Sequence, residues 1–310
     1  MTVRILCLHG MGSNAAIFAQ QTAPFRSLLA SDHEMVFLEA PNTCEPSPEV
    51  LGFYPGPYLC WYDTPTTAKV AAAHKFVLDY VERRGPFDGV IGFSQGAALA
   101  ASILLHHQLK SPSTPPPFSF SVFLGSPIPF SHSLRYGIDT RKAFGARIVT
   151  PTVRPNCPNE VPKYLITDPA YLRGEEELRR LAREKLMKSR LEAAEYTHNT
   201  VVDDSDVETP QGSASPSSVS EFGDNNDAED LPETFYQMFH HTCDEVRISI
   251  PSAHVYGRKD KWNLHSKDLV KLCERGSAET FEHGGGHEVP RGCAEEIADI
   301  VETVIASSLM

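Results

Sequence analysis

The chain has 310 residues, of which 41% are hydrophobic and 22% are charged, a composition typical of a globular protein with a sizeable core. Its formal net charge of −12 argues against nucleic acid as a partner, because phosphate binding needs a basic surface. The mean hydropathy of −0.26 and the lack of a run of roughly 18 apolar residues exclude a membrane span. The apolar start is too short for the core of a signal peptide, so we expect a cytoplasmic protein.

The seven cysteines are scattered and include no Cys-x-x-Cys pair. This pattern predicts neither a disulfide framework nor a zinc site, and we expect no metal and no organic cofactor. Most of the cysteines are expected to be small buried residues in a reducing compartment.

Strand and helix patterns alternate over the first 125 residues. Strands are predicted at 3–8, 35–38, 88–92 and 118–124, and helices from Ser13 or Asn14 towards Ala30, from Thr64-Pro65 to Gly85-Pro86, and at 97–105. The alternation returns after residue 245, with strands at 247–256 and 278–282 and helices at 264–273 and 294–307. The predicted fold class is therefore α/β, a parallel sheet with helices on both faces.

The middle of the chain interrupts this alternation. A charged helix is predicted at 173–196, with acidic residues early and basic residues later. Residues 197–232 are rich in Ser, Asp, Gly and Pro, and without the ten acids between Asp203 and Glu233 the net charge is only −2. Such a segment buries too little surface to offset its ordering entropy, so we predict that it is disordered. We expect one domain over residues 1–310, with residues 171–232 as an insertion.

The strongest local motif is Gly92-Phe93-Ser94-Gln95-Gly96. It follows an apolar strand and opens an Ala-rich helix, which is the setting of a nucleophile elbow. A glycine-rich turn that only packs a helix on a sheet is the structural alternative. A serine hydroxyl needs a base to remove its proton and a third group to orient that base.

The base and the acid are expected after later strands, in the chain order of α/β-hydrolases. His287 follows Gly284-Gly285-Gly286, and Asp260 follows Gly257-Arg258-Lys259. A turn or helix cap before Trp262 is the structural alternative for Asp260. The oxyanion is expected to bind to the backbone N–H groups of Met11 and Gln95, with His9 holding the loop of Met11 in shape.

Taken together, these motifs resemble those of a known protein family. Leu8-His9-Gly10, Gly92-Phe93-Ser94-Gln95-Gly96, Gly257-x-x-Asp260 and Gly-Gly-His287-x-x-Pro290 resemble the fungal serine hydrolase family. That family includes the homologues of ovarian tumour suppressor candidate 2 and the thioesterases that release polyketides in fungal secondary metabolism. The likeness covers about residues 1–135 and 245–308 and implies an α/β-hydrolase with a triad of Ser94, Asp260 and His287 that hydrolyses esters or thioesters. The long stretch between Ser94 and Asp260 departs from the family.

The aromatic loop before the elbow is also similar to that family. Its side chains are candidates to line an acyl pocket, with ordinary core packing as the alternative: Phe53, Tyr54, Tyr58, Trp61 and Tyr62. The resemblance implies a hydrophobic acyl thioester or ester as substrate, with a polyketide on a synthase's acyl carrier domain as one candidate.

Other functions remain open from the sequence. Leu8-His9-Gly10-Met11-Gly12 and the elbow motif also resemble acyl-protein thioesterases and bacterial-type carboxylesterases, which makes a general short-chain carboxylesterase an alternative. A non-catalytic binding module on the same scaffold is an alternative of another class, as is an interaction hub built on the acidic segment. The presence of serine, acid and histidine in the expected order favours an enzyme.

Overall fold

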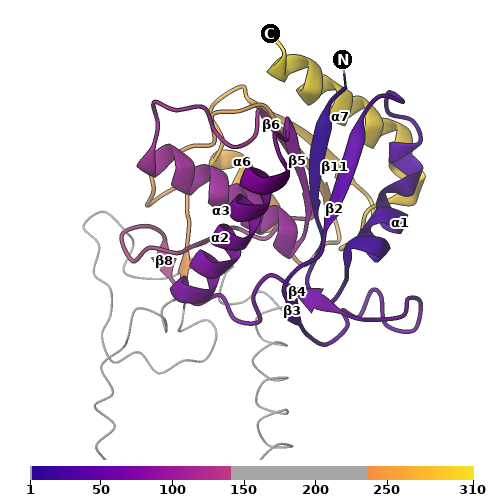
Figure 1. Ribbon diagram of the computed structural model, residues 1–310, viewed down its shortest axis with the longest axis horizontal. Coiled ribbons are helices and arrows are strands. Elements are labelled where there is room, and N and C mark those ends of the chain that lie inside the picture. Colours follow the sequence, from indigo (N-terminus) through magenta and orange to yellow (C-terminus); the bar gives the residue numbers. More distant parts are fainter. Residues whose placement is uncertain (1, 141–235) are drawn as a thin grey trace, which may run out of the picture.

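A six-stranded parallel sheet forms the centre of the computed structural model, which describes residues 2–140 and 236–310 (Figure 1). Its strands, in spatial order, are β2 (Glu34–Leu38), β1 (Arg4–Leu8), β5 (Gly89–Phe93), β6 (Phe120–Leu124), β10 (Ser252–Gly257) and β11 (Ala278–His283). All neighbours run parallel, which confirms the predicted sheet. The charged helix expected at 173–196 and the acidic segment that follows lie outside the described residues.

Helices cover both faces of the sheet. They are α1 (Ala15–Arg26), α2 (Thr67–Arg84), α3 (Gln95–Lys110), α6 (Asn263–Lys271) and α7 (Ala294–Ser308), with the short 3-10 turn η3 (Arg291–Cys293) before the last. α1 and α7 pack together on one face, and α2, α3 and α6 lie on the other (Figure 1). β5 and β6 are buried along their whole length, because a strand covered on both faces exposes neither set of side chains. No helix in this part of the chain is long and apolar enough to cross a bilayer.

Local capping explains where the helices begin. The side chain of Asn14 accepts a hydrogen bond from the N–H of Ile17 and caps α1, one of the two caps that the sequence predicts. α2 begins two residues later than predicted, because Thr66 caps it by accepting from the N–H of Lys69 at 3.2 Å. Its end before Gly85-Pro86 is as predicted.

One predicted strand is shorter than expected. The pattern at 247–256 predicts ten residues, whereas β10 begins at Ser252. Pro251 precedes it and has no N–H to give to a neighbouring strand, so the ladder starts after it. Ile248 instead forms a single bridge with Cys273.

Two small sheets lie outside the main one and were not predicted. The pair β3 (Asn42–Thr43) and β4 (Leu59–Cys60) is antiparallel, as is the three-stranded sheet β7 (Phe130–Ser131), β9 (Gln237–Met238) and β8 (Ile138–Asp139). In the second sheet, the two ends of the described ranges meet. The N–H of Thr140 donates to the carbonyl of Tyr236 at 2.8 Å, and the Thr140 hydroxyl donates to the same oxygen at 3.0 Å.

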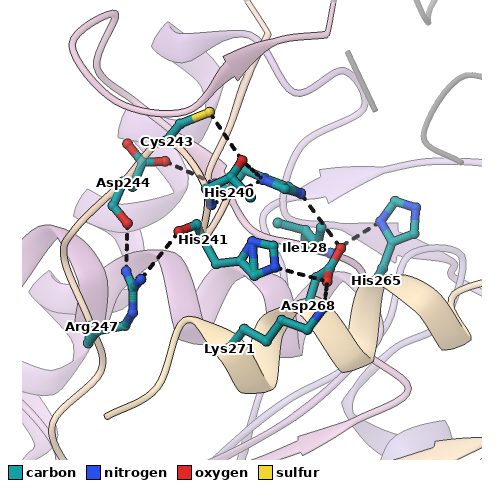
Figure 2. A network of polar contacts seen from close by, with 10 residues as sticks. Ile128, His240, His241, Cys243, Asp244, Arg247, His265, Asp268 and Lys271 are labelled. Carbon is teal, nitrogen blue, oxygen red and sulfur yellow. Dashed lines mark hydrogen bonds and ion pairs between the residues drawn. The ribbon is translucent and has the colours of Figure 1, made fainter. Parts of the chain in front are cut away.

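A buried polar network holds the segment after Tyr236 against α6 (Figure 2). Asp268 of α6 accepts a hydrogen bond from Lys271 Nζ at 2.8 Å, and His240 Nε2 and His241 Nε2 lie 3.6 and 3.5 Å from its oxygens. The carboxylate of Asp244 accepts from the backbone N–H of His240 at 2.9 Å. Because Asp268 and His240 are both buried, an unpaired charge here would be costly, and the pairing stabilises the position of α6.

This network predicts a pH-dependent stability. Burial disfavours the charged form of His240, but its contacts with Asp268 and Cys243 outweigh burial and raise its pKa to about 9. A histidine whose pKa is raised on folding stabilises the folded state fully at a pH below its unfolded pKa near 6.5. This stabilisation is lost as the pH rises through 9. We expect Asp268→Asn to destabilise the protein more at pH 6 than at pH 9.5, by about 1 kcal/mol or more in the free energy of unfolding. Urea titrations of both proteins at both pH values measure this difference, and an equal loss at both pH values contradicts it.

Candidate active site

The carboxyl ends of the parallel strands all meet at one edge of the sheet, and the candidate residues follow them directly. Ser94 comes after β5, Asp260 after β10 and His287 after β11. In a parallel sheet these ends form the crevice where ligands bind. Residues separated by nearly two hundred positions in the chain therefore become neighbours.

Ser94 has an unusual backbone conformation. Its φ of 52° makes it the one non-glycine residue with positive φ in the described ranges. Such a conformation costs on the order of 1–3 kcal/mol and persists only where the surroundings enforce it. A Cβ on Gly96 would lie 2.2 Å from the carbonyl oxygen of Leu8, so only glycine lets α3 start this close to the end of β1. The turn therefore holds the serine side chain above the sheet, as a nucleophile elbow does.

A continuous hydrogen-bond chain links the three candidate catalytic side chains. The hydroxyl of Ser94 lies 2.9 Å from His287 Nε2, and His287 Nδ1 lies 3.0 Å from Asp260 Oδ2. The carboxylate accepts only, so Nδ1 carries the proton and Nε2 is free to accept from the serine. This arrangement can move a proton from serine to imidazole and stabilise the charge that results.

The loop that carries Asp260 is hydrogen-bonded to the loop that carries His287. The side chain of Asp260 is fully buried, and its second oxygen accepts from the N–H of Trp262 at 2.8 Å. The N–H groups of Arg258 and Lys259 donate to the carbonyls of His283 and Gly285 at 2.8 and 2.9 Å. These main-chain bonds set the distance between Asp260 and His287.

The two residues expected to bind the oxyanion line the same pocket as Ser94. Gln95 is the first residue of α3, where backbone N–H groups have no acceptor within the helix. Met11 lies in the loop after β1. The start of α3 comes close to the end of that strand because residue 96 is a glycine. Both residues thus line the pocket that the start of α3 also lines, and a helix N-terminus favours negative charge.

The side chain of Gln95 ties the elbow to the aromatic loop. Its Oε1 accepts from the N–H of Trp61 at 2.9 Å, and its Nε2 donates to the carbonyl of Tyr62 at 2.7 Å. The indole N–H of Trp61 in turn donates to the carbonyl of His9 at 2.8 Å. One buried chain of contacts therefore runs from the elbow to the loop of Met11.

His9 holds that loop, as the sequence predicts. Its Nε2 accepts from the N–H of Ala40 at 3.1 Å, so Nδ1 carries the proton and donates to the carbonyl of Gly10 at 2.8 Å. Burial lowers its pKa and keeps the ring neutral, which fits this pattern of one acceptor and one donor. Both of its ring nitrogens are thus bonded to backbone groups, so His9 is not the base of the chain described above.

The pocket over Ser94 has a volume of about 1290 Å³ and a mostly apolar lining. Of the five aromatic candidates, Tyr54 and Tyr62 line it. The remaining three do not line it, contrary to the prediction. Phe53 is 80% exposed, Tyr58 donates its hydroxyl to the Tyr54 carbonyl at 2.7 Å, and Trp61 is buried in the core because its indole N–H finds a partner there.

Several lining residues were missed from the sequence. They are Phe130, Lys261, Trp262, Val289 and Arg291. Four of them stand within four positions of Asp260 or His287, so adjacency to the candidate residues was a usable signal. Phe130 gave no such signal, since it lies in β7, a strand that was not predicted. In the described part of the chain, no group of three or more His, Cys, Asp or Glu could hold a metal ion.

The strand order, the elbow after β5 and the loops after β10 and β11 are those of an α/β-hydrolase, as predicted. Among solved structures, SOBER1 of Arabidopsis thaliana is similar, with 14% identity, 98% of this chain and 100% of that chain covered, and a TM-score of 0.45.

Comparison with known sequences identifies the family. The esterase alnB of Emericella nidulans is 30% identical over 93% of this chain and 90% of its own length. The hydrolase FUB4 of Gibberella moniliformis is 30% identical over 98% of this chain and 97% of its own. The family model described as serine hydrolase (FSH1) matches residues 1–155 and 205–296. The chain therefore belongs to the serine hydrolase (FSH1) family.

Proposed function

We propose that this serine hydrolase cleaves hydrophobic acyl esters or thioesters with Ser94 as nucleophile, His287 as base and Asp260 as the acid that orients it. The observation that carries the proposal is the hydrogen-bond chain of these three side chains at the pocket, with the strained backbone at Ser94. Serine alone is a weak nucleophile at neutral pH, and this chain supplies the base that it needs.

In the first half of the reaction, Ser94 Oγ attacks the acyl carbon while its proton passes to His287 Nε2. The electron pair of the carbonyl moves to its oxygen, and the N–H groups of Met11 and Gln95 stabilise that charge. Asp260 stabilises the imidazolium. When the tetrahedral intermediate collapses, His287 gives its proton to the departing alcohol or thiol.

In the second half, water replaces the leaving group. His287 removes a proton from the water, which attacks the acyl-enzyme, and the same donors hold the second oxyanion. Collapse of this intermediate returns the proton to Ser94 Oγ and releases the carboxylic acid.

The size of the pocket favours a long acyl chain over a short one. Its 1290 Å³ exceed the 300–1,000 Å³ typical of pockets for drug-sized ligands. The lining also holds four acidic residues, Glu45, Glu49, Asp63 and Glu288, and two cations: Lys261, whose Nζ lies 3.9 Å from Glu49 Oε1, and Arg291. A phosphopantetheine arm bears a phosphate that such cations bind, so we propose a polyketide synthase's acyl carrier domain as one source of the thioester.

Ser94→Ala is expected to abolish labelling by a fluorophosphonate probe and to lower kcat by a factor on the order of 10⁴–10⁶, leaving the contribution of the oxyanion donors. Gel fluorescence and ester hydrolysis measure the two effects. Full labelling of the variant would assign the nucleophile to another residue.

Asp260→Asn is expected to leave the fold intact and to lower kcat by about 10³–10⁴-fold, because the amide stabilises the wrong tautomer of His287. Asp88→Asn is the matched control. Asp88 precedes β5 at the opposite edge of the sheet, where it accepts from the N–H of Arg4 at 2.7 Å. Near-normal turnover in Asp260→Asn with loss in the control refutes the assigned acid.

The pocket also predicts chain-length selectivity. With N-acetylcysteamine thioesters and matched oxyesters, kcat/KM is expected to rise at least about tenfold from acetyl to decanoyl, since each buried methylene contributes about 0.8 kcal/mol. Tyr62→Ala is expected to alter this ratio, and Phe53→Ala, at an exposed site outside the pocket, to leave it unchanged. A preference for acetyl esters would instead indicate a short-chain carboxylesterase.

A further inference from the structure

The two oxyanion donors come from segments that no strand ladder joins. The pairing of β1 with β5 ends at Leu8 and Gly92. Met11 and Gln95 each stand three positions beyond that last pair. An oxyanion needs both N–H groups within about 2.7–3.1 Å of one point. The contact at Gly96 limits how close the segments come, but packing has little direction, so hydrogen bonds must orient the two groups.

The direction of the Met11 N–H is set by the carbonyl of Gly10. Both belong to one trans peptide group, so they point in opposite directions. The Gly10 carbonyl accepts from Nδ1 of the fully buried His9 at 2.8 Å, so the N–H of Met11 points away from that buried ring. A Cβ on Gly10 would lie 3.2 Å from Ser94 Cβ, so this peptide adjoins the nucleophile. His9 therefore orients the donor that Met11 supplies.

Trp61 holds His9 at two points. Its indole N–H donates to the His9 carbonyl at 2.8 Å, and the centroids of the two rings lie 5.3 Å apart with 36° between the ring planes. Trp61 is 1% exposed and lies in the core, outside the lining of the pocket. A directed bond and a ring contact together fix the position of His9 from the interior.

The side chain of Gln95 completes the connection. Its Oε1 accepts from the Trp61 backbone N–H at 2.9 Å, and its Nε2 donates to the Tyr62 carbonyl at 2.7 Å. The residue whose backbone supplies one oxyanion donor therefore holds, through its side chain, the residue that fixes the other donor.

We propose that Trp61 is a positioning residue for hydrolysis: its indole N–H couples the donors of Met11 and Gln95, and formation of the tetrahedral intermediate depends on it although it touches no substrate. This inference rests on the proposed function, in which both N–H groups bind the oxyanion. A hydrogen bond strengthens as charge develops on the carbonyl oxygen, so misplaced donors destabilise the transition state more than the bound substrate. Misplacement by about 1 Å can cost on the order of 10²-fold in rate.

Trp61→Phe removes the indole N–H and keeps an aromatic ring in the core. With a small ester, kcat is expected to fall by about 10- to 100-fold. KM is expected to change little, because Trp61 does not line the pocket. The acid limb of the pH profile of kcat/KM, which reports the base His287, is expected to stay where it is in the wild type. An unchanged kcat, a loss confined to KM or a shifted acid limb overturns the proposal.

Val77→Ala is the matched control for stability. Val77 is fully buried on α2 and belongs to the same core cluster as Trp61. Its truncation is expected to lower the free energy of unfolding while kcat stays at the wild-type value. Equal losses of kcat in the two variants would show that any loosening of the core slows the enzyme, and would overturn the proposal.

A transition-state analogue tests the link to the oxyanion. Ser94 Oγ adds to the carbonyl carbon of an alkyl trifluoromethyl ketone, its proton passes to His287, and the ketone oxygen becomes an oxyanion. In Trp61→Phe, the inhibition constant of the ketone is expected to rise by the factor by which kcat/KM falls. The Kd of the matched secondary alcohol, which forms no oxyanion, is expected to stay unchanged. Unchanged affinity for the ketone overturns the proposal even where kcat falls.

Gln95→Met tests the other end of the connection, and it takes the place of Trp61→Phe if that variant does not fold. It keeps the backbone N–H of Gln95 and removes both side-chain hydrogen bonds. The same loss of kcat and of affinity for the ketone is expected, and wild-type values for both overturn the proposal. The double variant is expected to lose less than the product of the two single losses, because both substitutions break one chain of contacts. Fully multiplicative losses contradict the coupling.

The wild type separates this inference from the function on which it rests. A wild type that neither hydrolyses esters nor binds the ketone refutes the proposed function. An active wild type with an equally active Trp61→Phe refutes the role of Trp61 alone.

Discussion

The close packing of the start of α3 against the end of β1 is the constraint on which the rest of the site depends. Gly96 makes it possible, because any side chain there would meet the carbonyl oxygen of Leu8. The approach forces the backbone of Ser94 into positive φ and brings the first N–H groups of the helix beside the loop of Met11. The strain of about 1–3 kcal/mol is offset by the burial of β5 and of the first twelve residues of α3.

The aromatic loop contributes to this arrangement in a way that its composition does not reveal. Trp61 joins Gln95 to His9 through its backbone and indole N–H groups. A large aromatic residue thereby stabilises the geometry of the elbow without touching the pocket. Tyr62, its neighbour in the chain, has its carbonyl on Gln95 and its ring in the lining. Two adjacent positions of one loop therefore have different roles, one in the scaffold and one in the lining of the pocket.

Much of the fold was predictable because its signals are local. Continuous apolar runs mark the buried strands, and the Gly-x-Ser-x-Gly turn and the glycines before His287 mark two loops at the carboxyl edge. Which of Trp61 and Tyr62 lines the pocket was not predictable, since both are buried aromatic residues and the bond of the Trp61 indole N–H to the distant His9 leaves no local signal. The strands β7, β8 and β9 have two residues each and pair across a long sequence separation, so they leave no periodic pattern.

The meeting of Thr140 and Tyr236 has a consequence for how this chain tolerates change in length. Thr140 and Tyr236 flank the intervening stretch and are hydrogen-bonded to each other within a small sheet. This stem fixes their separation independently of the residues between them. Adding residues to a loop whose ends are already joined costs only about 0.6 kcal/mol per doubling of its length. The family match accordingly omits residues 156–204 and resumes beyond them. Changes in length between Thr140 and Tyr236 are therefore expected to leave Ser94 and its partners in place.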